Sequence, residues 1–262
     1  MTNSPQLTIR VMSSASPITQ IDPVTPPNRL LPKLLKSAVI GLGLIMGLGQ
    51  FAAAAEAPAN PHPTIRAMFG AKPTDKLDAK TTALLVIDFQ NEYYTGRMPI
   101  PDGMKALENT QRLIAFADKE HIQVIHVQHI APNGAAVFAK DGKTVDFHPL
   151  MTPRPQDKVI QKTTVSVFAS TDIDAQLKNA GIKTLIISGL MTHACVAAAA
   201  RDATPLGYDV VVASDATATR AITRANGRSV TKDELHESVL AEIEDTFGSV
   251  LTTAQIVALP VH

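Results

Sequence analysis

Cysteine is nearly absent from this chain of 262 residues: Cys195 is its one cysteine, and it has no tryptophan. A single thiol excludes an intramolecular disulfide and a zinc site built from several cysteines. Neither sign of charge is in excess, with 24 basic and 24 acidic residues, so we expect no nucleic-acid partner. Aromatic residues make up only 4% of the chain but hydrophobic residues 45%, which predicts one sizeable core held by aliphatic packing.

The first 55 residues differ in composition from the rest. Residues 1–28 are rich in Ser, Thr, Pro, Gln and Asn without an apolar period, which predicts a disordered extension. Residues 29–55 begin with three basic residues, continue with the apolar run Val39 to Met46 and end in alanines. This pattern is typical of a signal peptide cleaved after Ala55, so we expect an exported, periplasmic protein that is free of the membrane after cleavage. The alternative is an uncleaved signal that anchors the protein in the membrane.

Residues 56–80 begin with a proline-rich linker, and 81–262 have the composition of one globular domain. Within this domain, apolar runs that suit buried strands alternate with helical patterns. The strands are expected at 82–89, 122–128, 158–162, 183–188, 208–213 and near Val250. Helices are expected at 105–119, at 173–181, from Cys195 onward, and after the capping box at Thr231. The alternation predicts an α/β fold: three α-β-α layers around a mostly parallel, doubly wound sheet of about six strands.

Polar residues with useful chemistry follow several of the predicted strands. Asp88, Lys162, the 189–195 loop and Asp215 all fall at or just past strand ends, where ligands bind in an open parallel sheet. Taken singly, each has an ordinary explanation, as a helix cap, a turn or an edge lysine. Cys195 lies between an apolar run and an alanine-rich run, so we expect it at the start of a helix, where the helix dipole lowers a thiol pKa. The alternative is a small, buried and inert side chain.

Five motifs in a fixed order connect these residues to a known family. They are Leu85-Val-Ile-Asp-Phe-Gln-Asn91, Val159-Ile-Gln-Lys162 with Phe168, Gly189-Leu-Met-Thr-His-Ala-Cys-Val196, Arg201-Asp-Ala203 with Gly207-Tyr208, and Ser214-Asp-Ala216. In these motifs, from about Thr82 to Ala258, the chain resembles the isochorismatase-like cysteine hydrolases. That superfamily includes nicotinamidases, N-carbamoylsarcosine amidase and ureidoacrylate amidohydrolases.

The resemblance implies a catalytic triad of Asp88, Lys162 and Cys195. It further implies a cis peptide between Leu190 and Met191, and an oxyanion hole formed by the backbone amides of Met191 and Cys195. We expect the substrate pocket to draw on aromatic and histidine side chains near these positions, namely Phe89, Tyr93, His129, Phe168 and His193. The long segment 129–157 is expected to form a wall or lid of that pocket.

A metal cluster known from nicotinamidases is not expected here. Asp146-Phe-His148 has the letters of its Asp-x-His motif but lies far beyond the second strand, so we predict no metal and no cofactor, and His148 is interpreted as a turn residue. Similarly, His126 and His129 are spaced wrongly to face one way on a strand, which favours a core role for His126. The expected partners are a small-molecule substrate and further copies of the chain in a homo-oligomer.

Three functions remain open from the sequence. The leading hypothesis is a cysteine-dependent hydrolase of a small amide or N-carbamoyl compound, which breaks a C–N bond through a covalent thioester-type intermediate. The second is hydrolysis of a vinyl ether of the isochorismatase type, which needs a proton donor but no nucleophile, so that a thiol at Cys195 favours the first. The third is a non-catalytic binding protein on the same fold.

Overall fold

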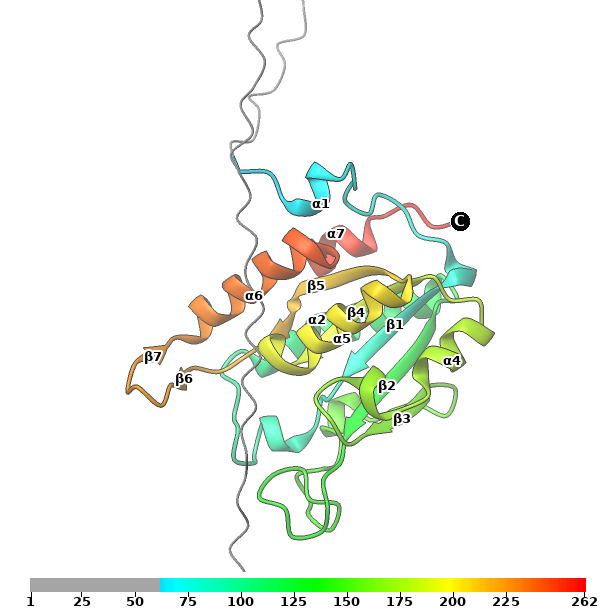
Figure 1. Cartoon of the computed structure of the whole chain (residues 1–262). Helices are drawn as coiled ribbons and strands as arrows, with labels where there is room; N and C mark the ends of the chain where they lie inside the picture. Colours follow the sequence, from blue (N-terminus) through cyan, green and yellow to red (C-terminus); the bar gives the residue numbers. More distant parts are fainter. Residues whose placement is uncertain (1–61) are drawn as a thin grey trace, which may run out of the picture. The chain divides into compact units, whose positions relative to one another are not determined.

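The computed structural model describes residues 62–262, and the predicted extension, signal segment and start of the linker lie outside the described residues. Six parallel strands form the central sheet in the order β3-β2-β1-β4-β5-β8 (Figure 1). Their bounds are Thr82–Ile87 (β1), Gln123–His129 (β2), Lys158–Lys162 (β3), Thr184–Leu190 (β4), Asp209–Ala218 (β5) and Ser249–Leu251 (β8). The predicted α/β fold with six parallel strands is confirmed.

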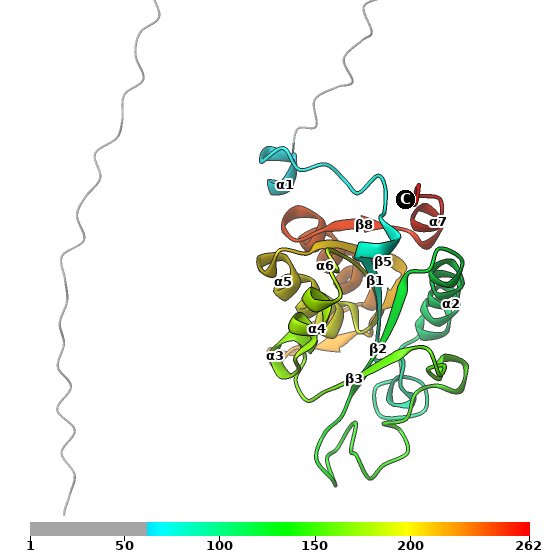
Figure 2. The same cartoon turned by 90° about the vertical axis from the view of Figure 1, so that its right-hand side faces the viewer.

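Helices cover both faces of the sheet (Figure 2). On one face lie α2 (Gly103–Lys119) and α7 (Thr253–Val257), and on the other lie α3 (Val167–Ser170), α4 (Ile173–Asn179), α5 (Ala197–Ala203) and α6 (Lys232–Thr246). Because helices pack on both sides, all six residues of β1 are buried, as its continuous apolar run predicts. The capping box at the start of α6 is present, with Thr231 and Glu234 bonding to each other's backbone.

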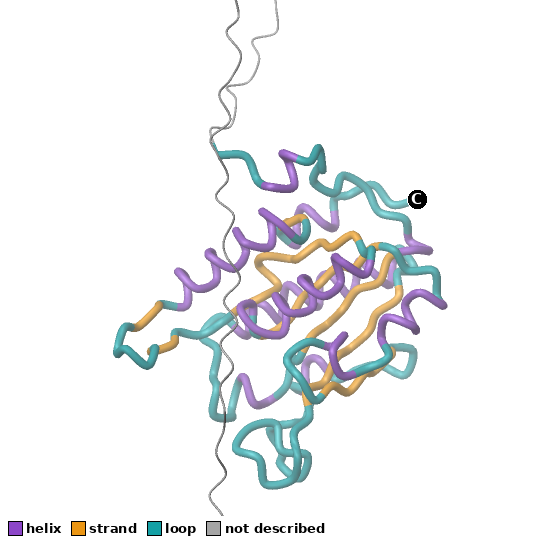
Figure 3. Tube along the Cα trace, viewed as in Figure 1, coloured by secondary structure: helices purple, strands orange, loops and turns teal. Residues whose placement is uncertain are grey.

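Shorter elements complete the described chain, and the sequence pattern does not predict most of them. They are α1 (Ile65–Met68), the single turns η1 (Ala79–Thr81), η2 (Asn91–Tyr93), η3 (Pro149–Met151) and η5 (Thr204–Leu206), the π-helical turn η4 (Thr192–Val196), and the antiparallel strands β6 (Ile222–Thr223) and β7 (Ser229–Val230). Two-residue strands carry no recognisable alternation, so sequence periodicity cannot find them. Figure 3 shows this hairpin extending from the end of β5. Among the described residues, no helix is long and apolar enough to span a membrane.

The strand order reverses between β1 and β4. The chain runs outward from β1 through β2 to β3, and then returns to the other side of β1 to form β4, β5 and β8. In a parallel sheet, the carboxyl ends of the two strands at this reversal diverge toward different connections and leave a crevice for ligands. Asp88 directly follows β1 and Cys195 follows β4, so the two residues face this crevice from its two sides.

Gly189 allows the ends of β1 and β4 to approach each other closely. It has a φ of 146°, and a Cβ built on it would lie 2.4 Å from the backbone oxygen of Ile87, the last residue of β1. The register of the β4–β5 pair also shifts between Ile187 and Gly189. A side chain at Gly189 would therefore push β4 away from β1 directly beside Asp88.

We predict that Gly189→Ala lowers the free energy of unfolding by about 3 kcal/mol, because the new Cβ meets backbone as well as an unfavourable φ. Gly227→Ala is the matched control, since Gly227 has a φ of 79° and open space around its Cβ. It should cost only about 1–2 kcal/mol, the price of the left-handed conformation alone. Urea unfolding measures both variants, and equal losses would show that the Ile87 contact does not constrain the sheet.

Candidate active site

One ammonium group joins the thiol and the carboxylate that the sequence singles out. The Nζ of Lys162, the last residue of β3, lies 2.8 Å from Oδ2 of Asp88 and donates a hydrogen bond of 3.3 Å to Sγ of Cys195. Asp88 and Lys162 are fully buried, and Cys195 is 5% exposed. The structure thus brings the three residues together at the carboxyl edge of the sheet, from three different strand ends.

His129, at the end of β2, belongs to the same cluster. Its Nδ1 lies 2.8 Å from Nζ of Lys162. Because an ammonium group only donates hydrogen bonds, Nδ1 is the acceptor and the ring proton sits on Nε2. Burial and the charge of Lys162 lower the pKa of His129 to about 4, so the ring is neutral at neutral pH. His126 is buried away from this cluster, with Nε2 3.4 Å from Oδ2 of Asp157 and its ring edge-on to that of Phe147 at 5.8 Å.

The thiol does not have the lowered pKa that its position in the sequence suggested. The helical segment begins at Thr192 with a π-helical turn, so Cys195 is the fourth residue of that turn and not the first residue of a helix. Burial and the negative charge of Asp88 raise the pKa of Cys195, and Lys162 opposes this only in part. The expectation of a thiolate favoured by the helix dipole is wrong for the resting protein, in which the thiol keeps its proton.

The carboxyl group of Asp88 is placed to exchange a proton with its neighbours. Burial raises the pKa of Asp88, and the charge of Lys162 opposes this rise. Asp88 itself has a φ of 56°, a left-handed conformation that Asp tolerates better than most residues. A carboxyl with a raised pKa beside a protonated thiol is suited to general acid–base chemistry.

The segment after β2 closes over the cluster with an aromatic side chain. The ring of Phe138 lies 4.8 Å from that of His129 and 5.3 Å from that of Tyr93. Burial, together with the nearby Cys195 and Asp88, raises the pKa of Tyr93, so its hydroxyl group keeps its proton. Tyr93 and His129 therefore line the site, and Phe138 joins them.

Sequence reasoning missed two residues that shape this wall. It indicated a wall in the segment 129–157 but did not single out Phe138. It quoted Gln90 within a motif but gave it no role, although this side chain ties the ends of β1 and β2 together. Its Nε2 donates to the backbone oxygens of His129 at 2.8 Å and Val145 at 2.6 Å, and its Oε1 accepts from the amide of His129 at 2.8 Å. The signal available in the sequence was a polar amide side chain two residues after Asp88, directly past a buried strand.

The remaining predicted residues make contacts elsewhere. Phe89 packs in the core on the α2 face of the sheet. The ring centroids of Phe168 and Tyr208 lie 6.0 Å apart. Nδ1 of His193 lies 2.5 Å from Oγ1 of Thr219. Asp215 accepts hydrogen bonds from the amide and hydroxyl groups of Thr253, so its carboxylate holds the start of α7. The peptide bond between Leu190 and Met191 is cis, at the position that the resemblance implies.

Three side chains of the cluster carry atoms that metals bind. One ligand atom each of Asp88, His129 and Cys195 lies within 4.8 Å of the other two, a mixed O, N and S set. The ammonium of Lys162, however, already contacts all three residues, at 2.8, 2.8 and 3.3 Å. A metal ion would have to displace this buried cation, so the residues present do not fit one. His148, which is interpreted from the sequence as a turn residue, accepts a hydrogen bond from the amide of Leu150 in the turn η3.

Comparisons with known proteins identify the family. The family model for the isochorismatase domain matches residues 82–255. An uncharacterized isochorismatase family protein of Bacillus subtilis is 34% identical over 175 residues, which cover 66% of this chain and 97% of that protein. A ureidoacrylate amidohydrolase of Acinetobacter baylyi is 26% identical over 70% of this chain and 84% of its own. The crystal structure of an isochorismatase from Pseudomonas putida matches with a TM-score of 0.68 at 28% identity, over 74% of this chain and 98% of that one.

The chain is a three-layer α/β protein with a buried thiol, carboxylate and ammonium group at the carboxyl edge of its parallel sheet. The match over 82–255 then names it: the chain belongs to the isochorismatase family. It is a hydrolase of that family.

We predict that the two charges beside the thiol tune its reactivity in opposite directions. Asp88→Asn should speed alkylation of Cys195 by iodoacetamide, and Lys162→Met should slow it, because Asp88 raises and Lys162 lowers the pKa of the thiol. Each change should reach about tenfold at pH 8, since the thiolate fraction changes about tenfold when the pKa changes by one. Mass spectrometry follows the reaction, and circular dichroism checks the fold. Rates in the reverse order would mean that charge does not control this thiol.

Proposed function

We propose that this protein is a cysteine-dependent hydrolase of a small amide or N-carbamoyl compound, in which Cys195 is the nucleophile. The observation that carries the proposal is the single ammonium of Lys162 in contact with both Asp88 and Cys195. This arrangement places the Asp88 carboxylate, a proton acceptor, near the nucleophile. The ammonium of Lys162 provides a fixed positive charge that contacts both groups. Both are needed for acyl transfer from a poor electrophile such as an amide.

In the first half of the reaction, Sγ of Cys195 attacks the substrate carbonyl carbon while Asp88 takes the thiol proton. The thiolate exists only as the S–C bond forms, which fits a thiol that is protonated at rest. Negative charge on the carbonyl oxygen is stabilised by the backbone amides of Met191 and Cys195. The C–N bond then breaks, Asp88 returns the proton to the nitrogen, and the amine or ammonia leaves a thioester or carbamoyl thioester on Cys195.

In the second half, water attacks the carbonyl carbon of this thioester and Asp88 takes a proton from it. A second tetrahedral oxyanion occupies the same pair of amides. The C–S bond breaks, the proton passes from Asp88 to the sulfur, and the acid product leaves. The positive charge of Lys162 favours the ionised form of Asp88, the form that accepts these protons.

The side chains that surround the site favour a substrate that is small and at least partly planar. Phe138, Tyr93 and His129 place three rings beside the cluster, and neutral His129 offers an Nε2–H donor toward substrate. A relative named as an amidohydrolase adds support for a C–N bond as the target. The family also includes isochorismatases, so vinyl ether hydrolysis is the alternative, with Asp88 as the proton donor and no role for sulfur.

The role of Cys195 separates these functions. A panel of nicotinamide, carbamoyl amino acids, ureido compounds and isochorismate is assayed for ammonia or pyruvate release. For the best amide substrate, we expect Cys195→Ala to lower kcat by about a thousandfold or more, because the covalent route is lost. Acid-quenched wild-type enzyme should also show the mass of an acyl or carbamoyl group on Cys195. Undiminished turnover in Cys195→Ala, with pyruvate released from isochorismate, would refute the proposal in favour of the vinyl ether reaction.

A further inference from the structure

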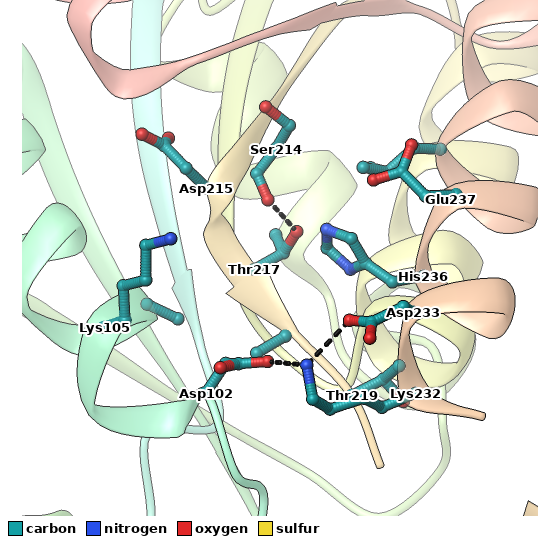
Figure 4. A pocket seen from close by; sticks show the side chains of 13 residues that line it. Asp102, Lys105, Ser214, Asp215, Thr217, Thr219, Lys232, Asp233, His236 and Glu237 are labelled. Carbon is teal, nitrogen blue, oxygen red and sulfur yellow. Dashed lines mark hydrogen bonds and ion pairs between the residues drawn. The ribbon is translucent and has the colours of Figure 1, made fainter. Parts of the chain in front are cut away.

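A histidine on α6 occupies a position that suits an apolar residue. Val239 and Leu240 are buried on this helix, and His236 lies three and four residues before them, on the same face. Figure 4 shows its ring at the edge of the pocket between α2 and α6, directed toward Ser214 and Thr217 of β5. The ring is half-buried, and burial lowers the pKa of His236, so the ring is neutral at neutral pH. A polar group in this position destabilises the fold unless it has hydrogen-bond partners, so the partners of His236 indicate its role.

His236 bonds to the segment that carries the nucleophile, residues 191–195, which we call the nucleophile turn. Its Nδ1 lies 2.9 Å from Oγ1 of Thr192, which is fully buried. A second hydrogen bond, to the backbone of Ser214, opposes the lowering of the pKa of His236 and is therefore donated by the ring. Because a neutral imidazole has one donor and one acceptor nitrogen, Nδ1 accepts and the hydroxyl group of Thr192 donates. One ring thus connects α6 and β5 to the nucleophile turn.

Thr219 bonds to the nucleophile turn from a second side. Strands β4 and β5 lie side by side up to the pair of Leu190 with Ala218, so Thr219 comes next to the turn that follows Leu190. Thr219 is buried, and its Oγ1 lies 2.5 Å from Nδ1 of His193. Thr192 and His193 are consecutive residues, so the turn is held from α6 through the first and from β5 through the second.

The nucleophile turn is not part of a regular α-helix. It is π-helical, and the amides of Ala194 and Val196 both bond to the carbonyl oxygen of Met191, at 3.1 and 3.3 Å. Met191 caps the turn without a side-chain hydrogen bond. Single π-helical turns are rare and occur mostly at functional sites. We therefore interpret the two histidine–threonine hydrogen bonds as supports for a backbone conformation that a regular helix does not provide.

We propose that His236 and Thr219 are positioning residues, which hold the amides of Met191 and Cys195 in place for the two tetrahedral intermediates. This inference rests on the proposed function, in which these amides form the oxyanion hole. The amides belong to the two ends of the nucleophile turn, and Thr192 lies between them with His193. Such donors must stay within about 0.5 Å of their productive positions, which requires support from a surrounding layer of hydrogen bonds.

Both residues act through the turn and not on the reacting groups. Among the described residues, no hydrogen bond or ion pair joins His236 or Thr219 to Asp88, Lys162 or Cys195. Loss of either residue should therefore leave the triad in place and weaken only the support of the amides. The expected signature is a lower kcat with little change in KM, because the amides are needed most in the transition state.

Valine variants of the two threonines remove one hydroxyl group each and keep the shape of the side chain. For the best amide substrate, Thr192→Val and Thr219→Val should each lower kcat about tenfold and change KM less than about twofold. Thr192→Ser and Thr219→Ser keep the hydroxyl group and should restore most of this loss. Thr110→Val is the matched control, because buried Thr110 donates to the carbonyl oxygen of Ala106 on α2, and its kcat should stay within about twofold of the wild type. Undiminished kcat in both valine variants of the turn would overturn the proposal.

Variants of His236 test whether the ring acts through Thr192. His236→Leu removes the acceptor and should lower kcat about tenfold, whereas the side-chain oxygen of His236→Asn lies near the place of Nδ1 and should retain most activity. The double variant His236→Leu with Thr192→Val should be no slower than the slower single variant, because both changes remove the same bond. Losses that multiply would show that His236 does not act through this bond and would refute its role.

Alkylation of Cys195 by iodoacetamide separates positioning of the amides from general damage to the site. Iodoacetamide reacts at a saturated carbon and forms no oxyanion, and Sγ of Cys195 is still held by Lys162. Thr192→Val and Thr219→Val should therefore keep the alkylation rate within about twofold while kcat falls. An equal fall in both rates would contradict a positioning role. Absence of amide turnover in the wild type would refute the proposed function, whereas an active wild type with unaffected variants would refute this inference alone.

Discussion

The ammonium group of Lys162 is the interaction on which the candidate active site depends. It contacts a carboxylate, a thiol and an imidazole that come from three other strand ends. The ammonium, carboxylate and thiol are buried, and the imidazole is half-buried. Burying charges costs several kcal/mol for each ion, so the pair formed by Asp88 and Lys162 is a poor way to stabilise a fold. The pair instead holds a carboxylate and a positive charge in fixed positions beside the sulfur.

The sheet brings these groups to one place through its strand order. Asp88 and Cys195 follow the two strands between which the order reverses, and β2 and β3 add His129 and Lys162 from the same edge. Gly189 allows β4 to lie against the end of β1, so backbone contact sets the separation of acid and thiol. The strand ends thus carry the carboxylate, the ammonium and the thiol, while the long loop segment after β2 supplies Phe138 as a wall. The strand-end motifs therefore identify the family from the sequence. The substrate cannot be predicted in this way, because the loop segment that forms the wall has no such motif.

The sequence predicts the sheet well because central parallel strands are apolar runs, and β1 begins at Thr82 as predicted. The bounds of β3, a shorter and more polar strand, also match the prediction residue for residue. The gathering of Asp88, Lys162 and Cys195 also follows from their places at strand ends. Asp215 shows the limit of that argument, since it has the same placement but caps α7. The pKa of Cys195 was predicted in the wrong direction because it depends on burial and on Asp88, neither of which local sequence reports. The place of Phe138 beside His129 and Tyr93 depends on tertiary packing alone.

The most direct test of the central interaction is a double-mutant cycle on Asp88 and Lys162. Urea unfolding is measured for wild type, Asp88→Asn, Lys162→Met and the variant with both changes. If the ammonium and the carboxylate compensate each other in the core, each single change should cost about 3–5 kcal/mol, because it leaves one buried charge alone. The double variant should then cost at least about 2 kcal/mol less than the sum. Losses that simply add would show that the two groups do not act as a pair and would contradict the account.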